Sequence, residues 1–73
     1  MSRIVALGER SRVKGFALAG VDILAAEDAA AAAAAFARLP DDTGVLILTP
    51  SAAAAIEAHL RRRRHLLWAV MPA

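Results

Sequence analysis

Four short apolar runs along the chain predict β-strands, because each has the length of a strand and is bounded by glycine, proline or charged residues. The predicted strands are Arg3–Gly8, Val21–Leu24, Val45–Leu48 and Leu66–Met71. The third is apolar at every position, as in a strand buried on both faces of a parallel sheet. The second carries Asp22, which suits an edge strand with one face in solvent.

Between these runs the sequence predicts helices at Glu9–Ala19, at Glu27–Leu39 and from Thr49 through about Arg63. The first is the weakest, because Gly15 lowers its helix propensity, and Gly20 is placed to end it. Residues 41–44, with the sequence DDTG, predict a turn whose aspartates act as local hydrogen-bond acceptors. In the third helix, Thr49 is placed to cap the N-terminus and Pro50 to take the first helical position.

The order β-α-β-α-β-α-β predicts an α/β fold with a parallel sheet in one domain, residues 1–73. Right-handed crossovers favour the strand order 2-1-3-4, a flavodoxin-like (Rossmann-like) three-layer fold without its last strand and helix. The first helix then covers one face of the sheet, and the other two cover the opposite face. The first helix's side of the third and fourth strands is left uncovered, and such an apolar face is a docking surface or an aggregation hazard.

Composition supports a protein that packs against a partner. Apolar residues make up 59% of the chain, but 20 of them are alanines, which add little buried area to a core. The net charge of +2 does not by itself call for nucleic acid or a membrane surface. The absence of cysteine excludes disulfides and thiol chemistry, and it fits a reducing compartment. The longest apolar run, residues 29–37, is too short to span a bilayer, so we expect a cytoplasmic protein.

The sequence contains no constellation that predicts catalysis, a metal site or a cofactor. The loop GERSRVKG at residues 8–15 fits neither common phosphate-binding motif, and Glu9 would repel a phosphate. Ser51 has no histidine and carboxylate partners in a recognisable order, and it is better interpreted as a residue of a helix N-terminus. His59 and His65 are six residues apart and cannot act as paired ligands on one helix face.

Two features remain as candidate partner contacts. The first is the run Arg61, Arg62, Arg63 and Arg64 at the end of the third helix, where cations are favoured by about 0.3–1 kcal/mol each. The run is a solvated helix end or a contact with an acidic protein, and it is least suited to nucleic acid because no aromatic residue interrupts it. The second is Trp68, either a core residue or the anchor of the open face. Strand alternation groups residues 66, 68 and 70 against 67, 69 and 71, but it leaves open which set faces the uncovered side.

Several segments match, in order, the motifs of a known family. Gly8-Glu9 and the later GFALAGV at 15–21 correspond to its opening, G-[DE]…GF-x-L-x-G-[VLI]. DTGVLILT at 42–49 corresponds to its D-x-G-[VI]-x-[IL]-[IL]-T segment, and MPA at 71–73 to its terminal I-P-[GS]. Together they resemble the F subunit of V/A-type rotary ATPases over essentially the whole chain. Within these segments we expect Gly8, Gly15 and Gly20 to form backbone turns, and Phe16 and Leu18 to pack the first helix.

This resemblance implies a non-catalytic, nucleotide-free part of the central stalk of a proton- or sodium-translocating ATPase or synthase. Members of the family dock on the coiled-coil stalk component, the D subunit, at the cytoplasmic side of the membrane complex. They commonly continue beyond the proline with a further helix, so the sequence resembles a short form of the family. Ala17 stands where the family often has a polar residue.

Two other interpretations remain open from the residues themselves. One is a small flavodoxin-like regulatory or ligand-binding module, with its site near Gly8, Thr49 and Pro72. The other is a homodimer that covers the open face with a second copy of the chain.

Overall fold

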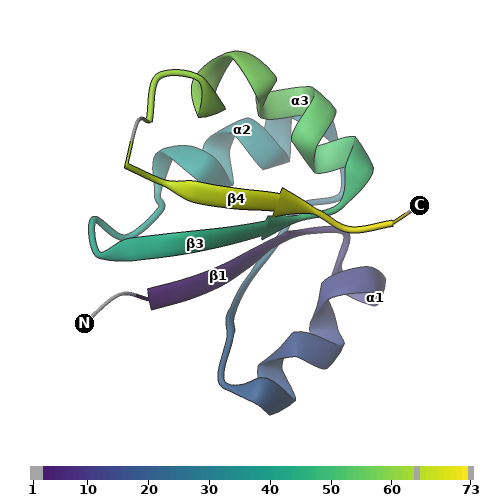
Figure 1. Ribbon diagram of the computed structural model, residues 1–73. Helices are drawn as coiled ribbons and strands as arrows, with labels where there is room; N and C mark the ends of the chain where they lie inside the picture. The colour runs from purple at the N-terminus through teal and green to yellow at the C-terminus, as the bar shows by residue number, and fades with distance from the viewer. Residues whose placement is uncertain (1–2, 64, 73) are drawn as a thin grey trace.

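The computed structural model describes residues 3–63 and 65–72, and its elements follow the predicted order (Figure 1). The strands are β1 (Arg3–Gly8), β2 (Asp22–Ala25), β3 (Thr43–Leu48) and β4 (Leu67–Val70). The helices are α1 (Arg10–Val13), α2 (Ala29–Ala37) and α3 (Pro50–Leu60), and a 3₁₀ helix, η1 (Lys14–Ala19), continues α1. All strand pairs are parallel and the order is β2-β1-β3-β4, which confirms the predicted fold class.

The main core lies on one face of this sheet, beneath α2 and α3, whereas α1 lies on the opposite face (Figure 1). Strands β1 and β3 contribute its bulk through Val5, Leu7, Leu46 and Leu48, all fully buried. The helices add mostly alanine to this core, together with larger residues such as Phe36, Ile56 and Leu60. Small side chains on the helices let them lie close to the sheet, so the large residues of the strands fill the space between the layers.

The strand register shows which side chains share a face, because paired residues of neighbouring strands point to the same side. Leu67 pairs with Val45, and Val45 pairs with Ile4, so these three form one row on the α1 side of the sheet. Trp68 pairs with Leu46 and therefore lies on the α2–α3 side, at the edge of the sheet.

On the α1 side, α1 and η1 pack over β1 and β2. The described part of the chain leaves β3 and β4 uncovered there, as the topology predicts. We call this surface the open face and define it by Ile4, Val45, Ile47, Leu67 and Ala69. Leu67 is 70% exposed and Ile4 43% exposed, whereas Val45 and Ile47, in the middle strand, are half-buried.

The first helix differs from its prediction, because it is α-helical over one turn and then tightens into η1. Residues three apart lie above one another in a 3₁₀ helix, so Phe16 stays on the side of the buried Val13 and is half-buried. Leu18 turns away from the sheet and is 96% exposed. The prediction that Leu18 packs this helix is therefore wrong.

The third helix also ends earlier than predicted, at Leu60 instead of about Arg63. Arg62 and Arg63 donate their backbone N–H groups to the carbonyls of His59 and Leu60, in the tighter i to i−3 pattern of a helix end. Ile56 has non-helical backbone angles inside α3, although its side chain is fully buried.

Arg3, at the start of β1, forms ion pairs with residues at the starts of the two neighbouring strands, β2 and β3. Its guanidinium contacts Asp22 at 2.9 Å and Asp42 at 3.0 Å, both in exposed ion pairs that raise the pKa of Arg3. Asp42 thus accepts a hydrogen bond from Arg3, which lies 39 residues away in the sequence. The local sequence predicted only hydrogen bonds within the turn at residues 41–44.

The three glycines expected in backbone turns differ in role. Gly20 has φ of +80° and ends η1, so its prediction is confirmed. Gly8 closes strand β1, where a Cβ atom would clash with the side chain of Thr49. Gly15 lies within η1, has no atom within 4 Å of the Cβ position and does not need positive φ. The prediction of a backbone turn is therefore wrong for Gly8 and for Gly15. At Gly8 the glycine instead allows the backbone of β1 to lie close to the side chain of Thr49.

We expect Gly8→Ala to lower the free energy of unfolding by about 1–3 kcal/mol, because Thr49 is held by its own hydrogen bonds and cannot move aside freely. Gly15→Ala is the matched control and should leave stability unchanged or raise it by up to about 1 kcal/mol. Urea unfolding of both variants measures the difference. Equal destabilisation would contradict the assignment of close packing to Gly8.

Candidate functional site

Strands β1 and β3 are neighbours, but the helices that follow them leave toward opposite faces of the sheet (Figure 1). The crevice at such a switch point is where ligands bind in open α/β sheets. Here the crevice is a pocket of about 160 Å³ whose polar lining consists of Glu9, Glu27, Asp28 and Ser51. Three carboxyl groups make this lining unsuited to a phosphate, as Glu9 alone had indicated.

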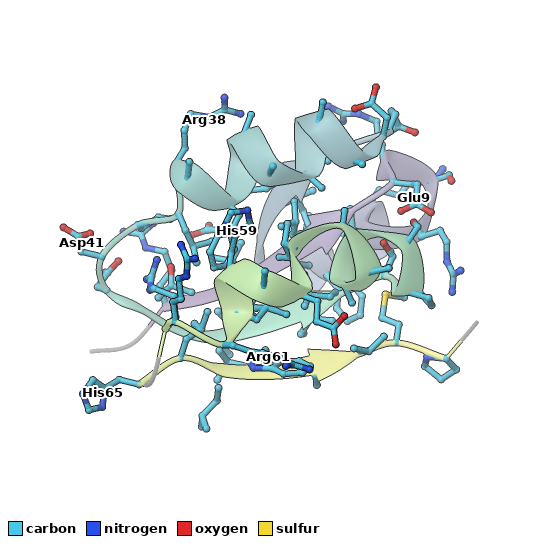
Figure 2. All side chains as sticks on the ribbon, turned by 90° about the horizontal axis from the view of Figure 1, so that it is seen from above. Glu9, Arg38, Asp41, His59, Arg61 and His65 are labelled. Carbon is cyan, nitrogen blue, oxygen red and sulfur yellow. The ribbon has the colours of Figure 1, made fainter. Side chains whose placement is uncertain are left out.

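The carboxylate of Glu9 is hydrogen-bonded to side chains at the start of α3 (Figure 2). Its Oε1 atom accepts hydrogen bonds from Thr49 Oγ1 at 2.6 Å and from Ser51 Oγ at 2.9 Å. The bond from Thr49 is the largest of the effects that lower the pKa of Glu9 below its ordinary value. Thr49 also accepts from the backbone N–H of Ala52, which caps α3 as predicted. Glu9 therefore fastens the end of β1 to the start of α3, in the place an anionic ligand would take.

Other internal hydrogen bonds close the same edge of the sheet. Glu27 Oε2 accepts from the backbone N–H of Arg10 at 2.9 Å, and Arg12 Nη2 donates to the carbonyl of Pro72 at 2.7 Å. The surroundings of Gly8, Thr49 and Pro72, expected in the ligand-binding interpretation, are thus taken up largely by the chain's own polar groups. Within residues 3–63 and 65–72, no group of three or more histidine, aspartate or glutamate side chains is arranged to hold a metal ion.

The described arginines of the run, Arg61, Arg62 and Arg63, differ in their surroundings. Arg61 makes an exposed ion pair with Glu57 at 3.1 Å. The guanidinium of Arg63 lies 5.6 Å from the centre of the Phe36 ring, and Arg62 and Arg63 line a pocket together. The prediction for Arg64 falls outside the described residues.

Strand β4 exposes apolar side chains on both faces of the sheet. Leu67 on the open face is 70% exposed, while Trp68 and Val70 on the α3 side are 46% and 44% exposed. Trp68 is therefore neither a buried core residue nor part of the open face. Parallel sheets normally bury both faces, and exposed apolar edge strands are sites of association. The structure thus adds Leu67 and Val70 to Trp68 as candidates for partner contact.

A family model described as ATP synthase (F/14-kDa) subunit matches residues 4–72, which include nearly all of every element described above. The chain belongs to the ATP synthase F-subunit family. The resemblance found in the sequence motifs is thereby confirmed, and this F subunit is an accessory component of a membrane-associated rotary ATPase. No curated protein sequence matches the chain. Over residues 3–63 and 65–72, none of the helices has the length and apolar character needed to cross a bilayer.

Sequence reasoning identified Glu9 only as a group that repels phosphate and missed its link to Thr49 and Ser51. The predicted topology contained the signal, because the residues after β1 and β3 must meet at one edge of the sheet. What the sequence could not supply was the approach of α3, which brings the two hydroxyl groups within reach of the carboxylate.

We expect Glu9→Gln to be less stable than the wild type at neutral pH, with the difference shrinking as the pH falls. Because folding lowers the pKa of Glu9, the stabilisation is fully present above the ordinary pKa of the carboxyl group and is lost as the pH falls through the lowered value. Thermal unfolding between about pH 7 and about pH 3 measures this convergence. Glu57→Gln, which removes only the exposed pair with Arg61, should change stability by less than about 1 kcal/mol and serves as the control. A constant difference between Glu9→Gln and the wild type at all pH values would contradict this role.

Proposed function

We propose that this F subunit is a non-catalytic rotor component of the central stalk in a proton- or sodium-translocating V/A-type ATPase or synthase, where it docks on the coiled-coil D subunit. Family membership supports the assignment to a rotary ATPase. The observation that carries the docking role is the open face together with the exposed edge strand beside it.

The open face has the form that a helical partner needs. Its row Ile4, Val45 and Leu67 crosses three adjacent strands, and Ile47 and Ala69 form a second row beside it. A helix of the coiled coil that presents apolar residues on its outward side can pack across both rows at once. Burial against a partner removes exposed apolar surface that a chain with this thin core leaves in water.

The hydrogen bonds that Glu9 accepts at the crevice between β1 and β3 support a non-catalytic role. Glu9 takes the position of an anionic ligand and accepts hydrogen bonds from two hydroxyl groups, so the usual ligand crevice of this fold serves to hold β1 and α3 together. On this proposal the protein transmits torque through rigid contact with the stalk, at the cytoplasmic side of the membrane complex.

We expect the F subunit and the coiled-coil D subunit from the same source to form a stable one-to-one complex in size-exclusion chromatography with light scattering. Leu67→Asp should weaken the complex at least about tenfold, because it places a charge in the apolar row that the partner would bury. Leu18→Asp is the matched control, since Leu18 is equally apolar and 96% exposed but lies on η1, and it should change affinity by less than about threefold.

Arg61 provides a second readout of the same complex. Arg61→Ala should weaken binding more at low salt than at high salt if the arginine faces acidic residues of the coiled-coil partner. Failure of the F subunit to bind the D subunit, with a homodimer in its place that Leu67→Asp disrupts, would contradict the proposed docking and favour self-association through the open face.

A further inference from the structure

Strand β4 forms one edge of the sheet, and its outer side has no neighbouring strand among the described residues (Figure 1). On its inner side, the backbone N–H of Met71 donates to the carbonyl of Leu48 in β3 at 2.7 Å. Because successive residues of a strand direct their N–H and C=O groups to alternate sides, Ala69 also faces β3. The N–H and C=O groups of Trp68 and Val70 therefore point away from the sheet, toward the free edge.

The backbone at the two ends of this edge is already engaged within the chain. Leu66 donates its N–H to the carbonyl of Arg63 at 3.2 Å. Pro72 has no N–H, and its carbonyl accepts from Arg12 Nη2 at 2.7 Å. The stretch of the edge that keeps both donors and acceptors free is thus short and lies between these two ends.

The sequence of β4 lacks the features that usually protect an edge strand. Proteins block free edges with charged side chains, proline or a β-bulge. Residues 66–72 contain no charged side chain, their proline follows the strand, and β4 pairs with β3 without a shift in register. The strand exposes Leu67 on one face and Trp68 and Val70 on the other. A helix docked on the open face covers only the first face, whereas a strand added at the edge contacts both.

We propose that the edge of β4 pairs antiparallel with β4 of a second copy of this chain, around a two-fold axis at Ala69. In this register Trp68 lies opposite Val70 of the second copy, and the two residues exchange a pair of backbone hydrogen bonds. The symmetry repeats this exchange, so every free N–H and C=O group of Trp68 and Val70 is satisfied in both copies. Each tryptophan also packs beside a β-branched side chain, which is a favourable cross-strand pair. The small side chain of Ala69 suits the close approach at the axis.

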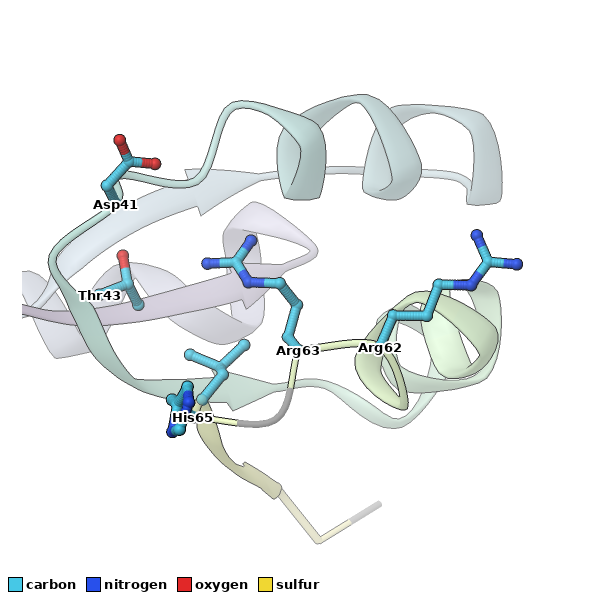
Figure 3. A pocket seen from close by; sticks show the side chains of 6 residues that line it. Asp41, Thr43, Arg62, Arg63 and His65 are labelled. Atoms are coloured by element: carbon cyan, nitrogen blue, oxygen red, sulfur yellow. The ribbon is translucent and has the colours of Figure 1, made fainter.

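The distribution of charge favours the antiparallel direction. Arg62, Arg63 and His65 precede β4 (Figure 3), whereas residues 66–72 are uncharged. Antiparallel pairing places the basic start of each strand beside the uncharged end of the other, and parallel pairing would bring the two basic segments together. Arg12, bound to the Pro72 carbonyl, adds one positive charge at the uncharged end, so the dimer should tighten as salt screens this repulsion.

The length of the strand limits the strength of the dimer. A pair of four-residue strands offers less area than the about 800 Å² per partner of a standard interface. We therefore expect a weak dimer, with a Kd between about 10 µM and about 1 mM. Such a dimer is dissociated at the lower concentrations that suffice to measure a tight one-to-one complex with the stalk.

Sedimentation equilibrium of the full chain without its coiled-coil partner, up to about 1 mM, measures this association. Amide exchange on the same samples locates it. The amides of Trp68 and Val70 should exchange more slowly as the dimer fraction rises, whereas those of Ala69 and Met71 already face β3 and serve as internal controls. A monomer at about 1 mM, or a dimer in which the amides of Trp68 and Val70 exchange as they do in the monomer, would overturn the proposal.

Val70→Pro removes an outward donor from each copy and keeps the hydrogen bonds to β3, so the protein should remain folded. The variant should raise the Kd of the dimer at least about tenfold, and thermal unfolding checks the fold. Ile4→Lys is the matched control, because Ile4 lies on the open face in β1, with β3 between it and β4, and it should change the Kd by less than about threefold. Loss of the dimer with Ile4→Lys and not with Val70→Pro would assign association to the open face and overturn edge pairing.

Ala69→Cys tests the register without changing the edge backbone. The chain has no cysteine of its own, and Cα atoms directly opposite at a non-hydrogen-bonded position lie about 4.5 Å apart, within reach of a disulfide. Oxidation should therefore yield a covalent dimer. Ala17→Cys, at another exposed alanine on η1, should stay largely monomeric. Equal cross-linking of both variants would overturn the register. Since these assays contain no coiled-coil partner, their results do not depend on the proposed docking.

Discussion

The handedness of the connections between parallel strands is the constraint on which the rest of this structure depends. With the order β2-β1-β3-β4, the first crossover runs in one direction along the sheet and the next two run in the other. Because each crossover is right-handed, α1 must lie on one face while α2 and α3 lie on the other. Four strands with three helices therefore leave half of one face without cover. The open face is a consequence of topology and not of a local choice of residues.

The alanine content of the helices determines how the covered face is packed. Ala32, Ala35 and Ala52 are almost fully buried, yet each contributes only a methyl group. The helices can therefore approach the sheet closely, and Leu7, Leu46 and Leu48 from the strands provide the volume. The main core built in this way is thin and lies on one side, and the fully buried Ala6 and Val13 add a smaller contribution on the other. A partner on the open face would add apolar burial where the chain itself has least.

Different polar groups lie at the carboxyl ends and at the amino ends of the parallel strands. At the carboxyl ends of β1 and β3, hydroxyl groups of Thr49 and Ser51 satisfy the Glu9 carboxylate, and no positive side chain lines the crevice among the described residues. At the start of β3 and β4, Arg62 and Arg63 line a pocket with a buried hydroxyl that no described residue satisfies. The fold's usual ligand site has thus become a structural joint between β1 and α3.

The sequence by itself determined the order of the elements, the parallel sheet and the family. Each rests on local signals: the apolar run of β3, the cap at Thr49, the left-handed turn at Gly20 and motifs read in order along the chain. The bounds of α1 and α3 were less predictable, because α1 gives way to a 3₁₀ helix after Val13 and α3 ends in i to i−3 hydrogen bonds after Leu60. Only the tertiary structure decided which side of β4 carries Trp68, why Gly8 has no side chain and what Glu9 binds. These depend on strand register and on contacts between residues about 40 positions apart, and local physical chemistry cannot specify either before the chain is folded.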